Sequence, residues 1–242
     1  MRVALQLRCL PRLYFACVVA LLLAGCATAP ATPTEIGWAP EENWWAEAGR
    51  SGGWVPRRDG SSIRIRSAHL RNLYEVSQKI QEQSGITGQI AFLDTDELNA
   101  YAIEFNGVRQ IAFSLPLLEA ISDDRDALAT TIGHEAAHLH YAHEAARKAR
   151  NQLTMGDSPA IRGILTVNST FSRYEEREAD IKGMEWTIAA GFSPCGAART
   201  MRTIRALGGD TSENSFLSMH PGHGERIARA TTLAMRLDGR RC

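Results

Sequence analysis

A His-Glu-Ala-Ala-His pentapeptide at residues 134–138 lies within a long stretch of helical periodicity and constrains the fold more than any other feature. In an α-helix, residues four apart differ by about 40° around the axis, so His134 and His138 project to one side and can bind one metal ion. Glu135 lies about 100° from His134, where it can reach a water molecule at that metal. The spacing therefore predicts a catalytic site with one Zn²⁺ per chain and Glu135 as general base.

The flanking sequence favours a helix around the pentapeptide. Ser122 and the aspartates that follow it supply a cap and an acidic first turn. Apolar residues recur at helical spacing on the side away from His134, namely Leu128, Ile132, Ala136, Leu139 and Ala146. We expect one long helix through Ala146, with one face in the core, the histidine pair in a cleft, and Gly133 allowing a neighbouring backbone to approach closely.

A catalytic zinc ion usually has three protein ligands, so a third must come from elsewhere in the chain. Ser172 and Glu175 have the spacing of a capping box, which predicts the start of a second helix. Glu176 and Asp180 share one face of that helix, which predicts Glu176 as the third ligand and Asp180 as the acceptor of a hydrogen bond from a ligating histidine. Glu175 and Glu178 point elsewhere, and we expect them to face solvent.

The N-terminus has the pattern of an export signal. Three arginines precede an apolar run from Leu13 to Ala24, which is too short to span a bilayer comfortably. The run ends Leu23-Ala24-Gly25-Cys26, which resembles the bacterial lipobox, in which the cysteine carries lipid. An ordinary signal with an incidental cysteine is the alternative. We assign residues 1–25 to a lipoprotein signal peptide and 26–60 to a lipid-anchored tether with a Trp-rich extension.

Without the signal segment, the chain has 24 basic and 27 acidic side chains, a balance that gives no indication of nucleic-acid binding. Cys195 and Cys242 are then the cysteines left in the folded part. The sequence is compatible with a disulfide between them and equally with two free thiols. Four of the five tryptophans lie at 38–54, where packing of the extension is favoured over a substrate-gripping or membrane-interface patch.

The rest of the chain predicts a small sheet and several helices. Residues 68–83 form an amphipathic helix closed by Gly85, and two further helices are expected near 194–207 and 223–237. Apolar segments 89–93 and 108–113 are candidate strands separated by the turn Asn106-Gly107. A strand beside the zinc helix could take an extended peptide as an added strand. The candidate strand residues for this role are Asn99, Ala100, Tyr101 and Ala102.

Several separated motifs in order resemble one family. They include Asn99-Ala100-Tyr101-Ala102, HEAAH, Ser172–Asp180 with Glu and Asp four apart, Ala190–Pro194, and His220-Pro221 followed by Glu225-Arg226-Ile227. Over about residues 68–236 the chain resembles the HtpX and CAAX-prenyl-protease type of gluzincin zinc metallopeptidases, and most of all their periplasmic lipoprotein branch, which is LoiP- and BepA-like. The resemblance also places the third zinc ligand on Glu176.

The resemblance has implications for the remaining histidines and for the cell biology. It implies that His220 approaches the zinc, where it regulates access or assists catalysis; loop packing is the alternative. His140 and His143 are expected to be structural, because on a continuous helix neither reaches the same metal, and His69 and His223 are expected at the surface. The implied substrates are unfolded or misfolded envelope polypeptides. The implied location is the periplasm, where the lipid anchor attaches the protein to a bacterial membrane, with the outer membrane favoured. The implied partner is the outer-membrane assembly machinery.

These inferences predict a mainly helical α+β, zincin-like peptidase domain at residues 61–242, with a small sheet packed beside the HEAAH helix. The predicted function is a zinc metalloendopeptidase of the bacterial cell envelope. A zinc-containing periplasmic chaperone or assembly factor with little or gated proteolysis is the alternative. In a third interpretation the HEAAH sequence is accidental and the protein binds no stoichiometric zinc.

Overall fold

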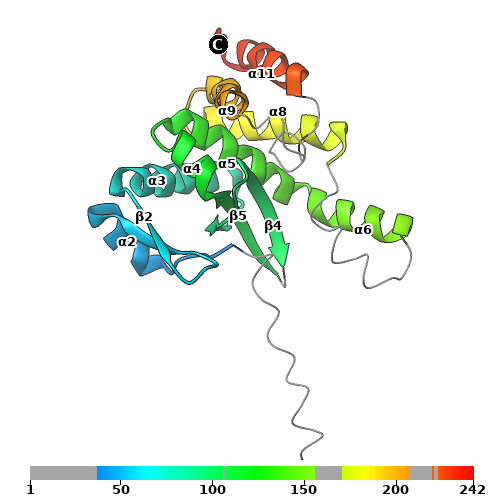
Figure 1. Cartoon of the computed structure of the whole chain (residues 1–242). Coiled ribbons are helices and arrows are strands. Elements are labelled where there is room, and N and C mark those ends of the chain that lie inside the picture. Colours follow the sequence, from blue (N-terminus) through cyan, green and yellow to red (C-terminus); the bar gives the residue numbers. More distant parts are fainter. Residues whose placement is uncertain (1–36, 106, 156–170, 208–219, 221–222) are drawn as a thin grey trace, which may run out of the picture. The chain divides into compact units, whose positions relative to one another are not determined.

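Strands of a small sheet precede most of the helices along the chain (Figure 1). The computed structural model describes residues 37–105, 107–155, 171–207, 220 and 223–242. Predictions for residues 1–25, Cys26 and the start of the tether lie outside these residues. The elements are α2 (Glu42–Ser51), β1 (Gly53–Pro56), β2 (Ser62–Ile65), α3 (Ser67–Ser84), β3 (Gln89–Leu93), β4 (Ala100–Phe105), β5 (Val108–Ser114), α4 (Leu115–Ile121), α5 (Arg125–His140), α6 (His143–Met155), α8 (Arg173–Ala189), α9 (Cys195–Ala206) and α11 (His223–Asp238).

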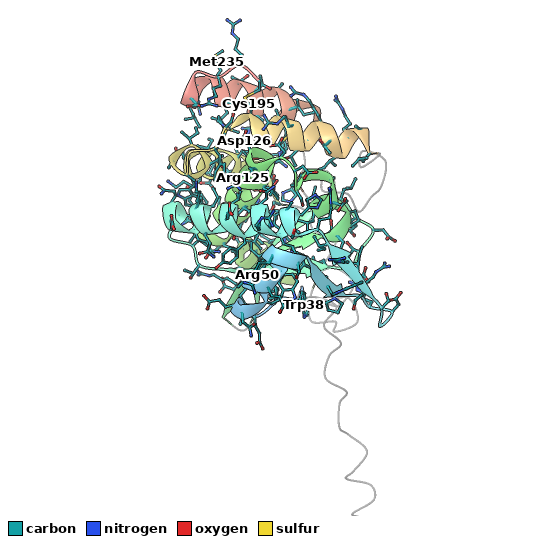
Figure 2. All side chains as sticks on the ribbon, turned by 90° about the vertical axis from the view of Figure 1, so that its left-hand side faces the viewer. Trp38, Arg50, Arg125, Asp126, Cys195 and Met235 are labelled. Atoms are coloured by element: carbon teal, nitrogen blue, oxygen red, sulfur yellow. A yellow bond between two sulfur atoms is a disulfide. The ribbon has the colours of Figure 1, made fainter. Side chains whose placement is uncertain are left out.

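The predicted mainly helical α+β fold is confirmed, and α5 lies at its centre. Helices α3, α8 and α9 and strand β4 all pack against α5. Side chains fill the space between the helices and the strands (Figure 2). The buried apolar ones form one large cluster that includes Ala127, Leu128 and Ile132 of α5. Every residue of α5 from Ala127 to Leu139 is buried, so the HEAAH sequence is part of the interior.

The predicted long helix begins within the expected acidic stretch but ends earlier than expected. Asp124 caps α5, because its side chain accepts hydrogen bonds from the amides of Asp126 and Ala127, whereas Ser122 ends α4. At the other end α5 stops at His140. Ala142 has a φ of 53°, in the left-handed region, and the chain turns there before α6 begins at His143. Neither glycine nor proline marks this break in the sequence.

The three-stranded sheet has the order β3-β5-β4. Segments 89–93 and 108–113 both form strands, as expected, and they pair with each other in parallel. The strand that runs antiparallel to β5 is β4, which ends at Phe105, and Gly107, just before β5, has a φ of 77°. Asn106 of the predicted turn lies outside the described residues. Strand β4 therefore lies at one edge of the sheet. At the other edge β3 pairs with Trp38 through a bridge at Phe92.

The Trp-rich segment packs into the same compact unit as the described residues that follow it. Trp38, Trp44 and Trp45 surround Phe92, and Trp45 also contacts Tyr74 on α3. The packing interpretation therefore holds for these three tryptophans. Trp54 on β1 is the exception, since it is 60% exposed.

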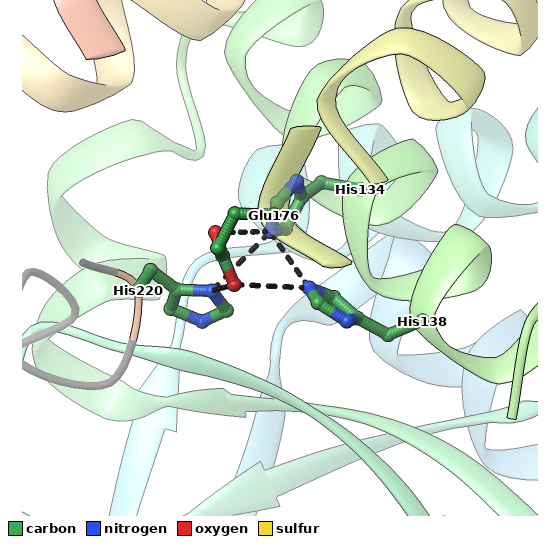
Figure 3. Close-up of side chains that lie close together, drawn as sticks. All are labelled: His134, His138, Glu176 and His220. Atoms are coloured by element: carbon green, nitrogen blue, oxygen red, sulfur yellow. Dashed lines mark hydrogen bonds and ion pairs between the residues drawn. The ribbon is translucent and has the colours of Figure 1, made fainter. Parts of the chain in front are cut away.

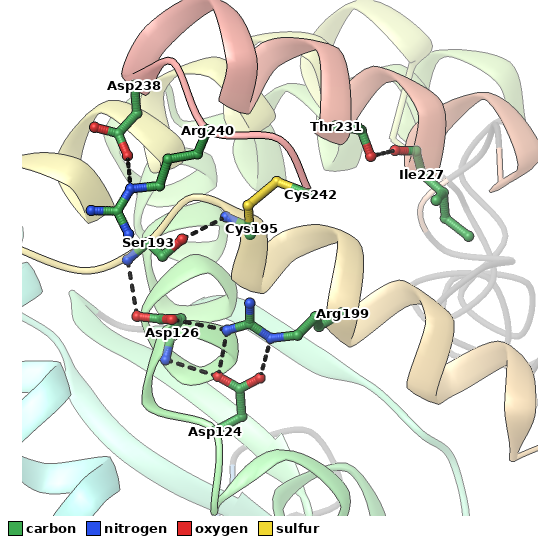
Figure 4. The surroundings of a disulfide bond; sticks show 10 residues. All are labelled: Asp124, Asp126, Ser193, Cys195, Arg199, Ile227, Thr231, Asp238, Arg240 and Cys242. Carbon is green, nitrogen blue, oxygen red and sulfur yellow. Dashed lines mark hydrogen bonds and ion pairs between the residues drawn. A yellow bond between two sulfur atoms is a disulfide. The ribbon is translucent and has the colours of Figure 1, made fainter.

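Cys195 and Cys242 form a disulfide, which resolves the alternative left open by the sequence (Figure 4). The bond joins the start of α9 to the C-terminal end of the chain, beside a second, smaller apolar cluster between α9 and α11. Arg199 on α9 binds both Asp124 and Asp126 at the start of α5. This ion-pair cluster and the disulfide fix α9 to its neighbours on both sides.

Two glycines let α5 and α8 approach closely. A Cβ atom added to Gly183 of α8 would lie 2.6 Å from the backbone nitrogen of His134, and one added to Gly133 would lie 2.6 Å from the carbonyl oxygen of Gly183. Neither backbone can move away without displacing its helix. The close approach predicted for Gly133 is thus confirmed, and it occurs next to the first histidine of the HEAAH sequence.

Across the described residues, no helix combines the length and apolar character needed to cross a bilayer.

We predict that Gly183→Ala destabilises the fold by about 1–3 kcal/mol, because overpacking outweighs the roughly 1 kcal/mol that alanine gains in helix propensity. Urea unfolding of the metal-free protein measures the change. Gly49→Ala in α2 is the matched control, since its Cβ would meet only the flexible Arg71 side chain at 3.2 Å. A Gly183→Ala protein as stable as the Gly49→Ala protein would contradict the close helix crossing.

Candidate metal centre

Four side chains from three segments converge at the centre of the fold (Figure 3). His134 and His138 come from α5, Glu176 comes from the first turn of α8, and His220 lies before α11. One donor atom from each lies within 4.8 Å of the others, and all four side chains are buried. The two helices thus bring together the predicted ligands His134, His138 and Glu176.

The donor atoms have the spacing that a tetrahedral ion requires. Nε2 of His134 is 3.1 Å from Nε2 of His138, and the Glu176 carboxylate is 3.6 Å and 3.5 Å from these two nitrogens. Ligands held about 2.0–2.1 Å from a tetrahedral zinc ion are about 3.3 Å apart. Two imidazoles and one carboxylate are also a typical donor set for catalytic zinc. The residues therefore fit the predicted metal.

A second layer of contacts holds His134. Its Nδ1 lies 3.2 Å from the carboxylate of Asp180, as predicted from the i, i+4 spacing of Glu176 and Asp180. Arg226, which is fully buried on α11, binds Glu176 at 3.0 Å and Asp180 at 2.6 Å. Arg229 binds the other oxygen of Asp180 at 2.9 Å. Helix α11 therefore fixes both carboxylates through two arginines.

Electrostatics keep these groups in the forms that bind a metal. Burial alone would raise the pKa of Glu176, but His220 and Arg226 outweigh it and hold that pKa well below its usual range. Burial lowers the pKa of His134 to about 3, despite its hydrogen bond with Asp180. Burial also lowers the pKa of His138. The centre therefore presents an ionised carboxylate and two neutral imidazoles.

Glu135 is fully buried beside the donor cluster. Among the described residues, neither of its carboxylate oxygens has a well-formed hydrogen bond. Burial raises its pKa well above the usual value, and the nearby charge of Glu176 raises it further. A buried carboxylate without a well-formed hydrogen bond is costly for stability, which indicates a group kept for chemistry.

His220 lies at the fourth corner of the donor cluster. Its Nδ1 is 2.8 Å from Glu176 and 3.3 Å from Nε2 of His134, and its Nε2 is 3.8 Å from Glu135. The ring of Phe171 packs against those of His220 and His138, with centroid distances of 5.7 Å and 4.0 Å. The predicted approach of His220 to the metal site is therefore present in this structure.

Strand β4 lies next to Glu135, at the edge of the sheet opposite β3. Helix α5 packs against it, and the backbone amide of Ala102 favours the charged form of Glu135. Before β4, Asn99 is buried and hydrogen bonds to Ser114 and to the amide of Ala100, while the Tyr101 hydroxyl donates to Glu97. The candidate strand Asn99–Ala102 therefore borders the centre.

Three expectations about side-chain exposure are wrong. His69 is fully buried, because α3 directs it between Glu119 and Asp123. Glu175 is buried as well: it completes the capping box and forms two hydrogen bonds with Arg150. Glu178 is half-buried and lies 3.4 Å from His143. The side chain of His223 is outside the described part.

The structure adds residues that spacing alone does not identify. Arg226, Arg229 and Phe171 reach the centre from segments distant in sequence. His143 lies 3.0 Å from His138, although a continuous helix would place it on the far side. The one sequence feature that points to Arg226 is its place in the Glu225-Arg226-Ile227 motif. No sequence feature points to Phe171.

Comparison with known proteins agrees with this geometry. The model of peptidase family M48 matches residues 69–155 and 144–234, which include every ligand candidate. The chain is also similar to "Mitochondrial metalloendopeptidase OMA1" of Arabidopsis thaliana, with 25% identity over 208 residues that cover 81% of this chain and 38% of that protein. It therefore spans less than half the length of this relative. The predicted metallopeptidase class is confirmed at the level of the family: the chain belongs to the metal-dependent peptidase family M48.

Proposed function

We propose that this protein is a zinc-dependent endopeptidase of the bacterial cell envelope, from the lipoprotein branch that resembles LoiP and BepA. The observation that carries the proposal is the convergence of His134, His138 and Glu176 beside the buried Glu135. When bound, a zinc ion supplies the Lewis acidity that polarises a peptide carbonyl and lets water attack it near neutral pH. His134, His138 and Glu176 would hold this ion.

Glu135 is the general base in this proposal. It takes a proton from the attacking water as the new carbon–oxygen bond forms, and it then passes that proton to the amide nitrogen as the carbon–nitrogen bond breaks. Its raised pKa suits the first transfer, since a carboxylate with a raised pKa accepts a proton more readily than an exposed one. His220 is the further donor for the oxygen that becomes negative, and it can also restrict access.

The edge of β4 is the proposed binding site for an extended stretch of substrate. Among the described residues no strand covers its free edge, whereas Trp38 covers the opposite edge of the sheet. Added-strand binding uses backbone groups and needs no particular side chains. This fits unfolded or misfolded envelope polypeptides as the substrate class.

Membrane attachment is proposed from the sequence of the export segment alone. The lipid on Cys26 would anchor the domain to the periplasmic face of a membrane, most often the outer membrane, close to the machinery that assembles outer-membrane proteins.

A chaperone or assembly factor with gated proteolysis is the second candidate. It is favoured by the position of His220, which lies at the fourth corner, where water would otherwise enter. Comparing wild type with Glu135→Gln in both peptide cleavage and suppression of aggregation separates the candidates. Cleavage by wild type that Glu135→Gln loses, with no suppression of aggregation by either protein, supports the peptidase. Equal suppression of aggregation by both proteins, with little cleavage by wild type, supports the chaperone.

We predict that Glu176→Ala weakens zinc binding by more than about 100-fold, beyond the roughly 10–100-fold cost of losing an outer contact. Competition with a chromophoric chelator measures the Kd. Glu185→Ala is the control, because Glu185 is exposed on the same helix. Equal zinc affinity in the two variants would remove Glu176 from the ligand set.

Glu135→Gln should retain one zinc per chain and lose about 10²–10⁴-fold in casein cleavage, because glutamine keeps the shape but cannot take the proton. Glu82→Gln on the exposed side of α3 is the control. Caseinolysis at the wild-type rate by the Glu135→Gln protein would rule out Glu135 as the base.

Cys26→Ser should abolish labelling by a fatty acid and shift the protein from the membrane to the soluble envelope fraction in a Gram-negative host, because serine offers no thiol for the lipid. Cys17→Ser, within the proposed signal segment, should change neither result. Lipid labelling that survives Cys26→Ser would disprove the assignment.

A further inference from the structure

The junction between α5 and α6 has the one non-glycine residue with a positive φ among the described residues. Ala142 adopts a φ of 53°, a conformation that an L-residue with a Cβ atom occupies at a cost. Ala142 itself is exposed, so its own packing does not account for this conformation. Backbone strain of this kind is retained where the surrounding structure needs it. The residue that the turn places is the next one, His143.

The turn directs His143 back against the end of the HEAAH sequence. Its ring is buried and stacks on Tyr141, with the ring centroids 5.3 Å apart and the planes at 20°. Nδ1 of His143 lies 3.0 Å from Nδ1 of His138. On its other side, Nε2 of His143 lies 3.4 Å from the carboxylate of Glu178 on α8.

The atoms of His138 define what this contact does. Nε2 of His138 faces the donor cluster, 3.1 Å from Nε2 of His134. A neutral imidazole that binds a metal through Nε2 carries its proton on Nδ1. That Nδ1–H then donates to the lone pair on Nδ1 of His143, and His143 carries its own proton on Nε2, where Glu178 accepts it. The hydrogen bonds thus run from His138 to His143 and from His143 to Glu178, in agreement with the two distances.

The same arrangement exists for the other histidine. Nδ1 of His134 is held by Asp180, and Asp180 is held by Arg226. Glu178 and Asp180 belong to the same helix as Glu176, so α8 supports both histidines and also supplies the carboxylate of the donor cluster. An acceptor behind each histidine fixes its ring orientation and tautomer.

We infer that His143 is a positioning residue that orients His138 for metal binding, with Glu178 as its own acceptor. The inference rests on the proposed zinc site. It replaces the purely structural role expected from a continuous helix, and it gives the strained turn at Ala142 a function. His143 does not bind the metal itself, because its Nδ1 faces His138 and its Nε2 faces Glu178.

Zinc titration of the full chain and three variants tests the inference. His143→Asn keeps an acceptor near the position of Nδ1 and loses the ring, whereas His143→Phe keeps a ring and loses the acceptor. His143→Ala loses both. We expect the Zn²⁺ Kd of the Asn variant to stay within about threefold of wild type, and that of the Phe and Ala variants to rise about 10–100-fold. His140→Ala, an exposed histidine at the end of α5, is the control.

A Phe variant that binds Zn²⁺ as tightly as wild type would overturn the inference and leave the proposed peptidase intact. Failure of wild type to bind Zn²⁺ would overturn both. A measurement without substitutions guards against variants that fold poorly. Nitrogen-15 NMR of zinc-loaded wild type should show a proton on Nδ1 of His138 and none on Nδ1 of His143. A proton on Nδ1 of His143 would also overturn the inference.

Discussion

The close crossing of α5 and α8 at Gly133 and Gly183 is the constraint on which the candidate centre depends. The two backbones meet where a methyl group on either glycine would lie 2.6 Å from the other helix. His134 follows Gly133 directly, and Glu176 lies two turns before Gly183, so the crossing sets the distance between imidazole and carboxylate. A wider separation would leave each helix intact but place the donors too far apart to share one ion.

Because the charged side chains at the crossing are buried, the candidate centre also depends on a balance of their charges. Glu135, Glu176 and Arg226 are almost fully removed from water, and an unpaired charge there would be costly. Arg226 compensates Glu176 and Asp180, which are thereby kept ionised. Glu135 is left outside this pairing, and its pKa is raised instead. By pairing Arg226 with Glu176 and not with Glu135, helix α11 leaves Glu176 ionised and able to hold a cation, and leaves Glu135 able to carry a proton.

Helical periodicity is sufficient to predict that His134 and His138 share one face of α5, and that Glu176 and Asp180 share one face of α8, because each pair lies four residues apart within an unbroken helix. Periodicity fails for His143, because the helix ends before Ala142 although neither glycine nor proline marks that point. The His143 side chain therefore points the opposite way from the one that a continuous helix would give it. The parallel pairing of β3 and β5 and the arrival of Arg226 and Phe171 depend on contacts between distant segments. Periodicity places His69 and Glu175 at the surface, whereas both are buried. Specific partners compensate the cost of burying them, and periodicity does not reveal those partners.

Crystals of the zinc-loaded full chain, with anomalous diffraction recorded at the zinc absorption edge, test the central claim most directly. The account predicts one zinc peak per chain, about 2.0–2.2 Å from Nε2 of His134, Nε2 of His138 and a carboxylate oxygen of Glu176. A chain without a zinc peak among these side chains, or with zinc bound only by other residues, would contradict it.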